Sequence, residues 1–215
     1  MRIAIVSDIH GHLAALEAVV ADLRETAPDL VVHGGDLADG GPNPAEVVDR
    51  IRDLGWPGVL GNTDEMHTRP ESLEDFARQS TQPRALWDSI RAMAKVTREA
   101  LGNDRVQWLS GLPLEFIHEQ LVLIHASPGD PWRSPGPAAT DEELERTYAP
   151  IGQAMVVYGH IHHPFVRRLA GRDGAALVVA NSGSVGLPHD GDPRPSYLLL
   201  DDFTPAIRRV AVPER

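Results

Sequence analysis

Two patterns of apolar positions alternate along the first third of the chain. Three short apolar runs each end in polar residues: 2–8, 29–36 and 56–62. Runs of this length predict buried β-strands. Two segments between these runs repeat apolar side chains at helical spacing: 12–28 and 43–55. The order strand, helix, strand, helix, strand predicts parallel strands with helices packed on their faces.

The pattern changes after residue 65. Residues 65–110 are charged and helix-prone, and we expect a helical insert whose clearest helices cover 85–102 and 104–112. Beyond the insert, short apolar runs separated by turn residues predict strands. These are two strands within 112–128, then 154–160, 165–171, 176–183 and 196–203. Residues 171–174, "GRDG", predict a hairpin turn, and 141–149 predict a short helix.

The mainly β second half predicts a second sheet packed on the first. Because both halves carry polar residues of the same kind, we predict a single domain over residues 1–215. Within it, the Pro- and Gly-rich segment 127–140 is either a lid over a substrate site or a plain surface loop. Trp132 and Arg133 in this segment favour a lid.

Composition limits the classes of function. The 215 residues carry a formal net charge of -11 and no cysteine. Disulfides, thiolate metal sites and cysteine nucleophiles are therefore excluded, and binding to a nucleic-acid polymer is disfavoured. No apolar run is long enough to span a membrane. The first residues lack the apolar core of a secretion signal, so we expect a cytoplasmic protein.

Five predicted strands end in polar clusters: "SDIH", "GGD", "GNTD", "IHASP" and "YGHIH". In sheets with crossover helices, ligands collect at the carboxyl ends of the strands. We therefore expect these clusters to converge on one crevice. Their donor groups are all oxygen or imidazole, and they come from these residues: Asp8, His10, Asp36, Asn62, His125, His160 and His162.

The spacing of these residues is typical of a metal site. Asp8 and His10 are two residues apart, as are His160 and His162. In an extended backbone such pairs point the same way, roughly 6–7 Å apart. Two ions in a hydrolytic site lie about 3.5–4 Å apart and need a carboxylate between them. Asp36 is the natural bridge, because the glycines before it let the backbone approach closely.

The ordered motifs "DIHGH", "GGDLADGGP", "GNTDE", "LIHASP" and "GHIHHP" resemble the calcineurin-like metallophosphoesterase family. The likeness runs from residue 6 to about residue 190. It is greatest to the small bacterial phosphodiesterases of that family, whose tail segment "NPGSVGQPRDG" resembles "NSGSVGLPHDG" here. The resemblance implies an α/β fold with two facing mixed β-sheets flanked by helices, in four α/β/β/α layers.

The resemblance also implies a ligand set for two divalent metal ions. Three residues would hold one ion: Asp8, His10 and His162. Three others would hold the second: Asn62, His125 and His160. Asp36 would bridge the two ions and hold a hydroxide between them. Mixed nitrogen and oxygen ligands suit manganese, iron, zinc or nickel, and manganese is expected on family grounds.

The implied activity is hydrolysis of phosphate esters by a metal-activated hydroxide. We expect a phosphodiesterase acting on small molecules or nucleotides. Three alternatives use the same site: a phosphomonoesterase, a protein phosphatase and a dinucleoside-polyphosphate hydrolase. A different class is a binding scaffold of the same fold that has lost the chemistry, although this sequence keeps every ligand residue. The sequence leaves the oligomeric state open.

One departure concerns the acid that protonates the leaving group. Many relatives carry a histidine where this chain has Thr63. His67, His12 or a water could replace it, and leaving groups of low pKa would be favoured. Asp64 is a candidate to orient a ligand histidine through a hydrogen bond. The remaining expectations are substrate contacts by Asn62, His12 and His189, and a packed, non-ligating role for His33.

Overall fold

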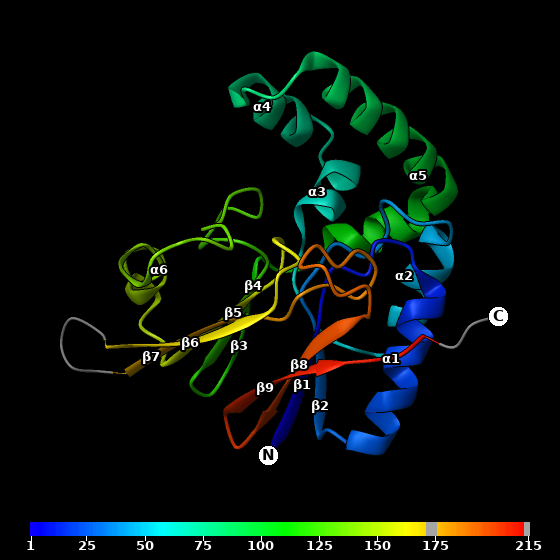
Figure 1. Cartoon of the computed structure of the whole chain (residues 1–215). Coiled ribbons are helices and arrows are strands. Elements are labelled where there is room, and N and C mark those ends of the chain that lie inside the picture. Colours follow the sequence, from blue (N-terminus) through cyan, green and yellow to red (C-terminus); the bar gives the residue numbers. More distant parts are fainter. Residues whose placement is uncertain (171–175, 213–215) are drawn as a thin grey trace.

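Two mixed β-sheets form the centre of the computed structural model, which describes residues 1–170 and 176–212 (Figure 1). The first sheet has the strand order β2 (Leu30–His33), β1 (Arg2–Val6), β8 (Ser196–Asp201) and β9 (Thr204–Arg209). The second has the order β3 (Glu115–His118), β4 (Leu121–Ile124), β5 (Met155–Tyr158), β7 (Ala176–Asn181) and β6 (Phe165–Ala170). The pair of facing sheets confirms the predicted fold class.

Both sheets combine parallel and antiparallel pairs. In the first, β1 pairs with β2 in parallel and with β8 in antiparallel. In the second, the central strands β4, β5 and β7 are parallel, while β3 and β6 run antiparallel at the edges. The parallel strands place their carboxyl ends at one edge of each sheet, so the loops that follow them meet.

Side chains alternate between two apolar layers along the central strands. Ile3 and Ile5 of β1 face the second sheet and pack in a core with Leu123 and Val157. The opposite face of β1 packs against helices, which explains why its sequence is apolar throughout. Burial on both faces thus makes these short strands rigid supports for the loops at their ends.

Helices cover the outer faces of the sheets. Helices α1 (Leu13–Thr26) and α2 (Pro44–Leu54) share a core with the first sheet, together with the end of α5 (Arg84–Ser110). Helix α6 (Asp141–Tyr148) covers the second sheet and is followed by a short 3-10 turn, Ala149–Ile151. The predicted order of helix, sheet, sheet and helix layers is therefore confirmed.

The helical insert extends away from the sheets (Figure 1). It begins with α3 (Asn62–Thr68) and α4 (Glu71–Gln79) and continues into α5. Helix α5 bends at Gly102, whose φ of 66° and ψ of 174° are not helical. The two predicted helices on either side of this glycine are thereby confirmed. We call α4 and residues 84–101 the helical arm; it has a small core of its own around Leu73 and Trp87.

One local prediction needs correction, one strand was missed, and one prediction falls outside the description. Residues 56–62 do not form a strand: only Gly58 bridges to His33, and Asn62 already begins α3. Pro57 supplies a carbonyl to His33 but has no N–H for a ladder. Strand β9 was not predicted, because its proline and arginines mask an edge strand. The predicted turn at 171–174 lies outside the described residues.

No helix within the described part of the chain is long and apolar enough to cross a membrane.

Candidate metal centre

The polar strand-end residues converge, but through a backbone geometry different from the one predicted. Five of them have left-handed backbone angles, with φ between 51° and 65°: Asp8, His10, Asp36, His160 and His162. The extended pairing expected for Asp8 and His10 is therefore wrong. Each chain instead turns sharply as it leaves its strand, and the turn directs the side chain inward. The loops after β1 and β2 hold each other, since the N–H of Asp8 donates to Gly35 O at 3.0 Å.

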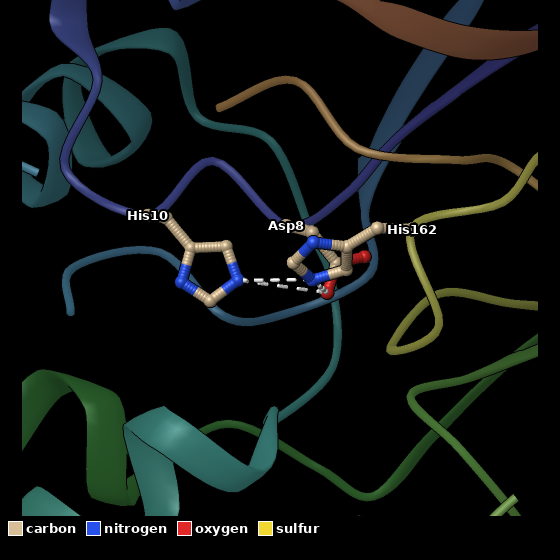
Figure 2. Close-up of side chains that lie close together, drawn as sticks. All are labelled: Asp8, His10 and His162. Carbon is tan, nitrogen blue, oxygen red and sulfur yellow. Dashed lines mark hydrogen bonds and ion pairs between the residues drawn. The ribbon is translucent and has the colours of Figure 1, made fainter. Parts of the chain in front are cut away.

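One group of three candidate ligand residues lies at the ends of β1 and β5. Figure 2 shows Asp8, His10 and His162 pointing toward a common point. His162 Nε2 lies 3.2 Å from Asp8 Oδ1 and 3.2 Å from His10 Nε2, and His10 Nε2 lies 3.9 Å from Asp8 Oδ1. Their donor atoms all lie within 4.8 Å of one another. This spacing allows three donors to face one small cation.

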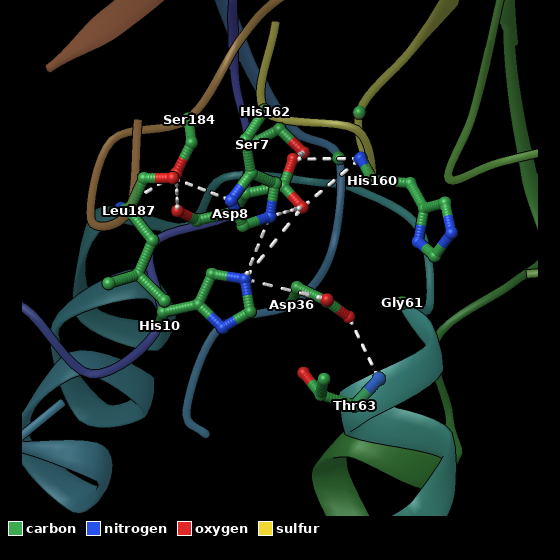
Figure 3. Close-up of polar contacts among 12 residues, drawn as sticks. Ser7, Asp8, His10, Asp36, Gly61, Thr63, His160, His162, Ser184 and Leu187 are labelled. Carbon is green, nitrogen blue, oxygen red and sulfur yellow. Dashed lines mark hydrogen bonds and ion pairs between the residues drawn. The ribbon is translucent and has the colours of Figure 1, made fainter. Parts of the chain in front are cut away.

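A second group lies beside the first. Asn62 Oδ1 is 3.0 Å from His125 Nε2 and 2.9 Å from His160 Nδ1. Asp36 is between the groups, with Oδ1 at 3.5 Å from His125 Nε2 and Oδ2 at 3.6 Å from His10 Nε2. Its two carboxylate oxygens thus face different groups of imidazoles. Figure 3 shows this carboxylate between His10 and the backbone of Thr63, whose N–H donates to Oδ1 at 2.9 Å.

Backbone carbonyls fix three of the imidazole rings. His10 Nδ1 lies 2.5 Å from Asp39 O, His125 Nδ1 lies 2.7 Å from Gly34 O, and His162 Nδ1 lies 2.6 Å from Leu187 O. A carbonyl oxygen can only accept, so Nδ1 carries a proton, and in the neutral ring Nε2 keeps its lone pair. The free lone pairs are the ones that face the centre. Metal-binding histidines are oriented in this way.

The buried carboxylate of Asp64 braces two of the loops. It accepts N–H groups from Asp36 at 2.7 Å, Leu37 at 3.0 Å and Gly61 at 3.1 Å. The predicted hydrogen bond from Asp64 to a ligand histidine is therefore wrong, because backbone donors occupy both oxygens. Burial, and then the charge of Asp36, raises the pKa of Asp64 to about 7.

Two serines that the sequence reasoning missed support Asp8 (Figure 3). Ser7 donates its hydroxyl to Asp8 Oδ2 at 2.6 Å, and Ser184 donates to Asp8 O at 2.7 Å. Ser184 Oγ also accepts the N–H of Leu187 at 2.8 Å, and the carbonyl of that residue holds His162. The segment "NSGSVG" was the available signal, since a small-residue turn next to the site can approach the ligands closely.

The electrostatics of the centre favour cation binding. Although burial alone would raise it, the pKa of Asp8 is held below its usual range by His162 and then by the other imidazoles. Burial lowers the pKa of His10 and lowers that of His160 to about 4. Although burial alone would lower them, the pKa values of His125 and His162 are raised by the charges of Asp36 and Asp8, so a metal at these two rings would compete with protons. Charged carboxylates and neutral imidazoles are the ligand forms that a metal requires.

Two glycines pack against the candidate ligand carboxylates and leave no room for a side chain of their own. A Cβ on Gly61 would lie 2.1 Å from Asp36 Oδ1, and a Cβ on Gly159 would lie 2.4 Å from Asp8 Oδ2. Larger residues would displace both carboxylates. The donor set of carboxylate, amide and imidazole groups suits borderline divalent ions, so the residues present fit the metals that the sequence implies.

The other candidate residues lie around the centre. His189 is exposed and stacks on His162, with ring centroids 4.4 Å apart. His12 occupies the N-cap position of α1, beside Gly186. His67 is buried in α3, and burial, followed by the charge of Arg98, lowers its pKa to about 4. At neutral pH this ring is uncharged, which disfavours the acid role expected for it. Of these three candidates, His189 alone contacts a candidate ligand side chain within residues 1–170 and 176–212.

Two facing mixed sheets with carboxylate and imidazole groups at their strand ends are the features of a metal-dependent hydrolase of phosphate esters. The chain belongs to the calcineurin-like phosphoesterase superfamily, whose domain model matches residues 1–202. The family resemblance read from the five motifs is thereby confirmed. The protein is an enzyme that hydrolyses phosphate esters, and its family implies divalent metal ions.

Individual relatives share the sequence or the fold of this chain. An uncharacterized protein of Methanocaldococcus jannaschii is 33% identical over 227 residues, covering 97% of this chain and 86% of the relative. The crystal structure of a metallophosphoesterase from Sphaerobacter thermophilus has a TM-score of 0.79 at 27% identity, covering 99% of this chain and 89% of the other. A hypothetical protein of Pyrococcus horikoshii OT3 has a TM-score of 0.80 at 19% identity with the same coverage, which shows a shared fold.

Proposed function

We propose that the protein is a dinuclear metal phosphodiesterase that acts on small molecules or nucleotides. The observation that carries this proposal is the position of Asp36, whose two carboxylate oxygens face two separate groups of ligands at 3.5 and 3.6 Å. A carboxylate in this position can hold two cations close together, because it offsets their mutual repulsion. Manganese is the metal that we expect.

The ligands divide between two metal positions. Asp8, His10 and His162 would hold one ion, and Asn62, His125 and His160 would hold the other, with Asp36 shared. Two bound divalent ions supply the Lewis acidity that activates water and stabilises charge on phosphorus. The protein keeps the ligands in place through the carbonyls that fix three of the rings and through Asp64, which fixes the Asp36 loop. Asn62 could also contact the substrate phosphate.

The surroundings of the centre favour esters with good leaving groups. Thr63 stands where many relatives have a histidine, and its backbone N–H is used by Asp36. His67, the nearest candidate acid in α3, is neutral at neutral pH because its pKa is about 4. Without a charged acid, an alkoxide of high pKa leaves slowly. We therefore expect activated diesters and phosphoanhydrides to react faster than alkyl monoesters.

Hydrolysis of bis-p-nitrophenyl phosphate by metal-loaded protein tests this proposal. Asp36→Ala should lower kcat/KM by more than about 10²-fold, the loss typical of removing one charge-stabilising group. Elemental analysis should find two ions per wild-type chain and fewer in the variant. The control is Asp104→Ala, which removes an exposed carboxylate paired with Arg52 and should change neither result.

The opposite results would identify another class of function. Protein that binds no manganese, iron, zinc or nickel and hydrolyses neither mono- nor diesters would be a scaffold of the same fold. Activity with p-nitrophenyl phosphate that exceeds activity with the diester would assign a phosphomonoesterase instead.

A further inference from the structure

A cleft of about 230 Å³ lies between α3, α4 and α5, and α3 begins at the candidate ligand Asn62. Its floor is apolar and includes Met66, Leu73 and Ala94. Three cationic side chains of α5 also line it: Arg91, Lys95 and Arg98. An apolar surface with a few charged groups is typical of a site that binds an organic anion.

Two of the three cations have no carboxylate partner. Arg91 forms a bidentate ion pair with Glu74, at 2.7 and 2.9 Å, so a carboxylate already neutralises its charge. Within residues 1–170 and 176–212, neither Lys95 nor Arg98 forms an ion pair with an acidic side chain; Arg98 has a 3.4 Å hydrogen bond to Asn103. Unmatched cations on a chain of net charge -11 indicate a place where an anion would be stabilised.

A buried histidine joins the wall of the cleft to residues around the metal centre. His67 lines the cleft, its side chain is 2% exposed, and its Nε2 has no hydrogen-bond partner in the described part of the protein. Arg98 lines the same cleft, and its charge helps burial to lower the pKa of this ring. The cations that could meet an anion in the cleft are therefore Lys95 and Arg98.

The cleft is connected to the metal centre through α3. His67 follows Thr63 by one helical turn, about 5.4 Å along the axis, and the N–H of Thr63 donates to Asp36. On its other side, His67 Nε2 lies 3.9 Å from Asp39 Oδ1, and the carbonyl of Asp39 holds His10. The cleft therefore begins about one turn of α3 away from the candidate ligand Asn62.

We propose that the cleft binds the leaving group of a substrate in which an organic body carries a second anionic group, as in a nucleotide released from a phosphodiester or phosphoanhydride. The apolar floor would contact the body, while Lys95 and Arg98 would contact the anion. This proposal rests on the proposed function, because the substrate phosphate is placed at the metal centre. It makes the helical arm a determinant of specificity.

Kinetics with two substrates test the proposal. Diadenosine tetraphosphate has a leaving group with additional phosphates, whereas bis-p-nitrophenyl phosphate has none. In the double variant Lys95→Gln/Arg98→Gln, the ratio of the KM of the first substrate to that of the second should rise about tenfold, as expected for the loss of charge-assisted hydrogen bonds. The control Arg78→Gln/Arg84→Gln removes the same charge from the exposed end of the arm and should leave the ratio unchanged. An unchanged ratio in the first variant, or an equal change in the control, overturns the proposal.

A binding measurement separates this proposal from the proposed function. Lys95 is the only lysine of the chain, so an amine-reactive reagent modifies Lys95 and the N-terminal amine alone. In chelator-treated protein, millimolar ADP should slow modification of Lys95 at least threefold and leave the rate at Met1 unchanged, as followed by peptide mass spectrometry. Hydrolysis of the diester without this protection would overturn the cleft assignment alone. Protection of Lys95 in a protein inactive with every metal would overturn the proposed function and keep the cleft as an anion site.

Discussion

His33 is a fully buried histidine at the end of β2 that is not a candidate ligand. Its side chain is 0% exposed and packs beside Trp108, with ring centroids 6.2 Å apart. Gly58 lies against the ring so closely that a Cβ there would be 2.3 Å from His33 Cγ. Burial lowers the pKa of His33 to about 4, because the charged imidazolium loses its hydration there. The packed, non-ligating role read from the sequence agrees with this environment.

This low pKa makes the stability of the fold depend on pH. The unfolded chain binds a proton at its ordinary pKa of 6.5, whereas the folded chain does so only near 4. Between these values the unfolded state holds more protons, so the free energy of unfolding falls as the pH falls from 6.5 toward 4. The difference between the two pKa values corresponds to about 3 kcal/mol of unfolding free energy, at 1.36 kcal/mol per pKa unit. About 2 kcal/mol of this is lost by pH 5.

Two substitutions separate titration from burial. His33→Leu and His33→Gln both remove the titrating ring, and each should lose about 2 kcal/mol less stability than the wild type between pH 7.5 and pH 5. At pH 7.5 the leucine variant should exceed the glutamine variant by about 1–3 kcal/mol, because only glutamine buries an amide. Urea unfolding measures both quantities.

The assay uses chelator-treated protein, because imidazole ligands release metal when they are protonated and would add their own pH dependence. The remaining histidines titrate in all three proteins and cancel in the comparison. A wild-type loss between the two pH values that equals the loss in both variants would refute the assignment of a depressed pKa to His33.

Two further predictions concern the supports of the metal centre. Asp64→Asn replaces an acceptor of backbone N–H groups with an amide that can accept at only one oxygen, and should cost about 1–3 kcal/mol in urea unfolding at pH 8; unchanged stability would contradict the bracing role. The backbone angles of Gly61 are ones that alanine adopts without strain, but the Cβ of Gly61→Ala would lie 2.1 Å from Asp36 Oδ1. Elemental analysis should therefore find fewer than two ions in this variant, while Gly136→Ala, whose Cβ meets nothing within 4 Å, keeps the wild-type content.

The sequence predicted the layers of the fold because burial on both faces leaves a simple pattern. Strands β1, β4 and β5 are apolar at consecutive positions, and helices α1 and α2 repeat at helical spacing. Strand β9 could not be recognised in this way. It lies at the edge of its sheet, so exposed polar positions and Pro205 interrupt its pattern. The start of α3 carried a readable signal, since Asp64 is the third residue of the helix and accepts the N–H of Gly61.

The candidate ligands could be predicted from residue type, but the way in which they converge could not. The sequence analysis expected Asp8 and His10 to lie close together, and they do. It assumed an extended backbone, however, whereas both residues have left-handed angles. The contact from Ser184 was also hidden, since this residue lies 176 positions away from Asp8. Such contacts depend on tertiary structure, which a local pattern does not encode.

The left-handed turns explain how the centre is built to hold cations at fixed positions. A non-glycine residue in this conformation costs of order 1–3 kcal/mol and persists only where its surroundings hold it. Here the surroundings are backbone hydrogen bonds, such as His10 N–H to Asp36 O at 2.9 Å and Gly186 N–H to Asp8 O at 3.0 Å.

The same turns bring together ligands from both sheets. Asp8 and Asp36 follow strands of the first sheet, whereas His125, His160 and His162 follow strands of the second. Without cations, Asp8 and Asp36 repel each other in a buried site. Bound cations would replace this repulsion with attraction across the two sheets. Metal binding should therefore stabilise the packing of the sheets as well as supply the chemistry, because the ions interact with the folded arrangement and not with the unfolded chain.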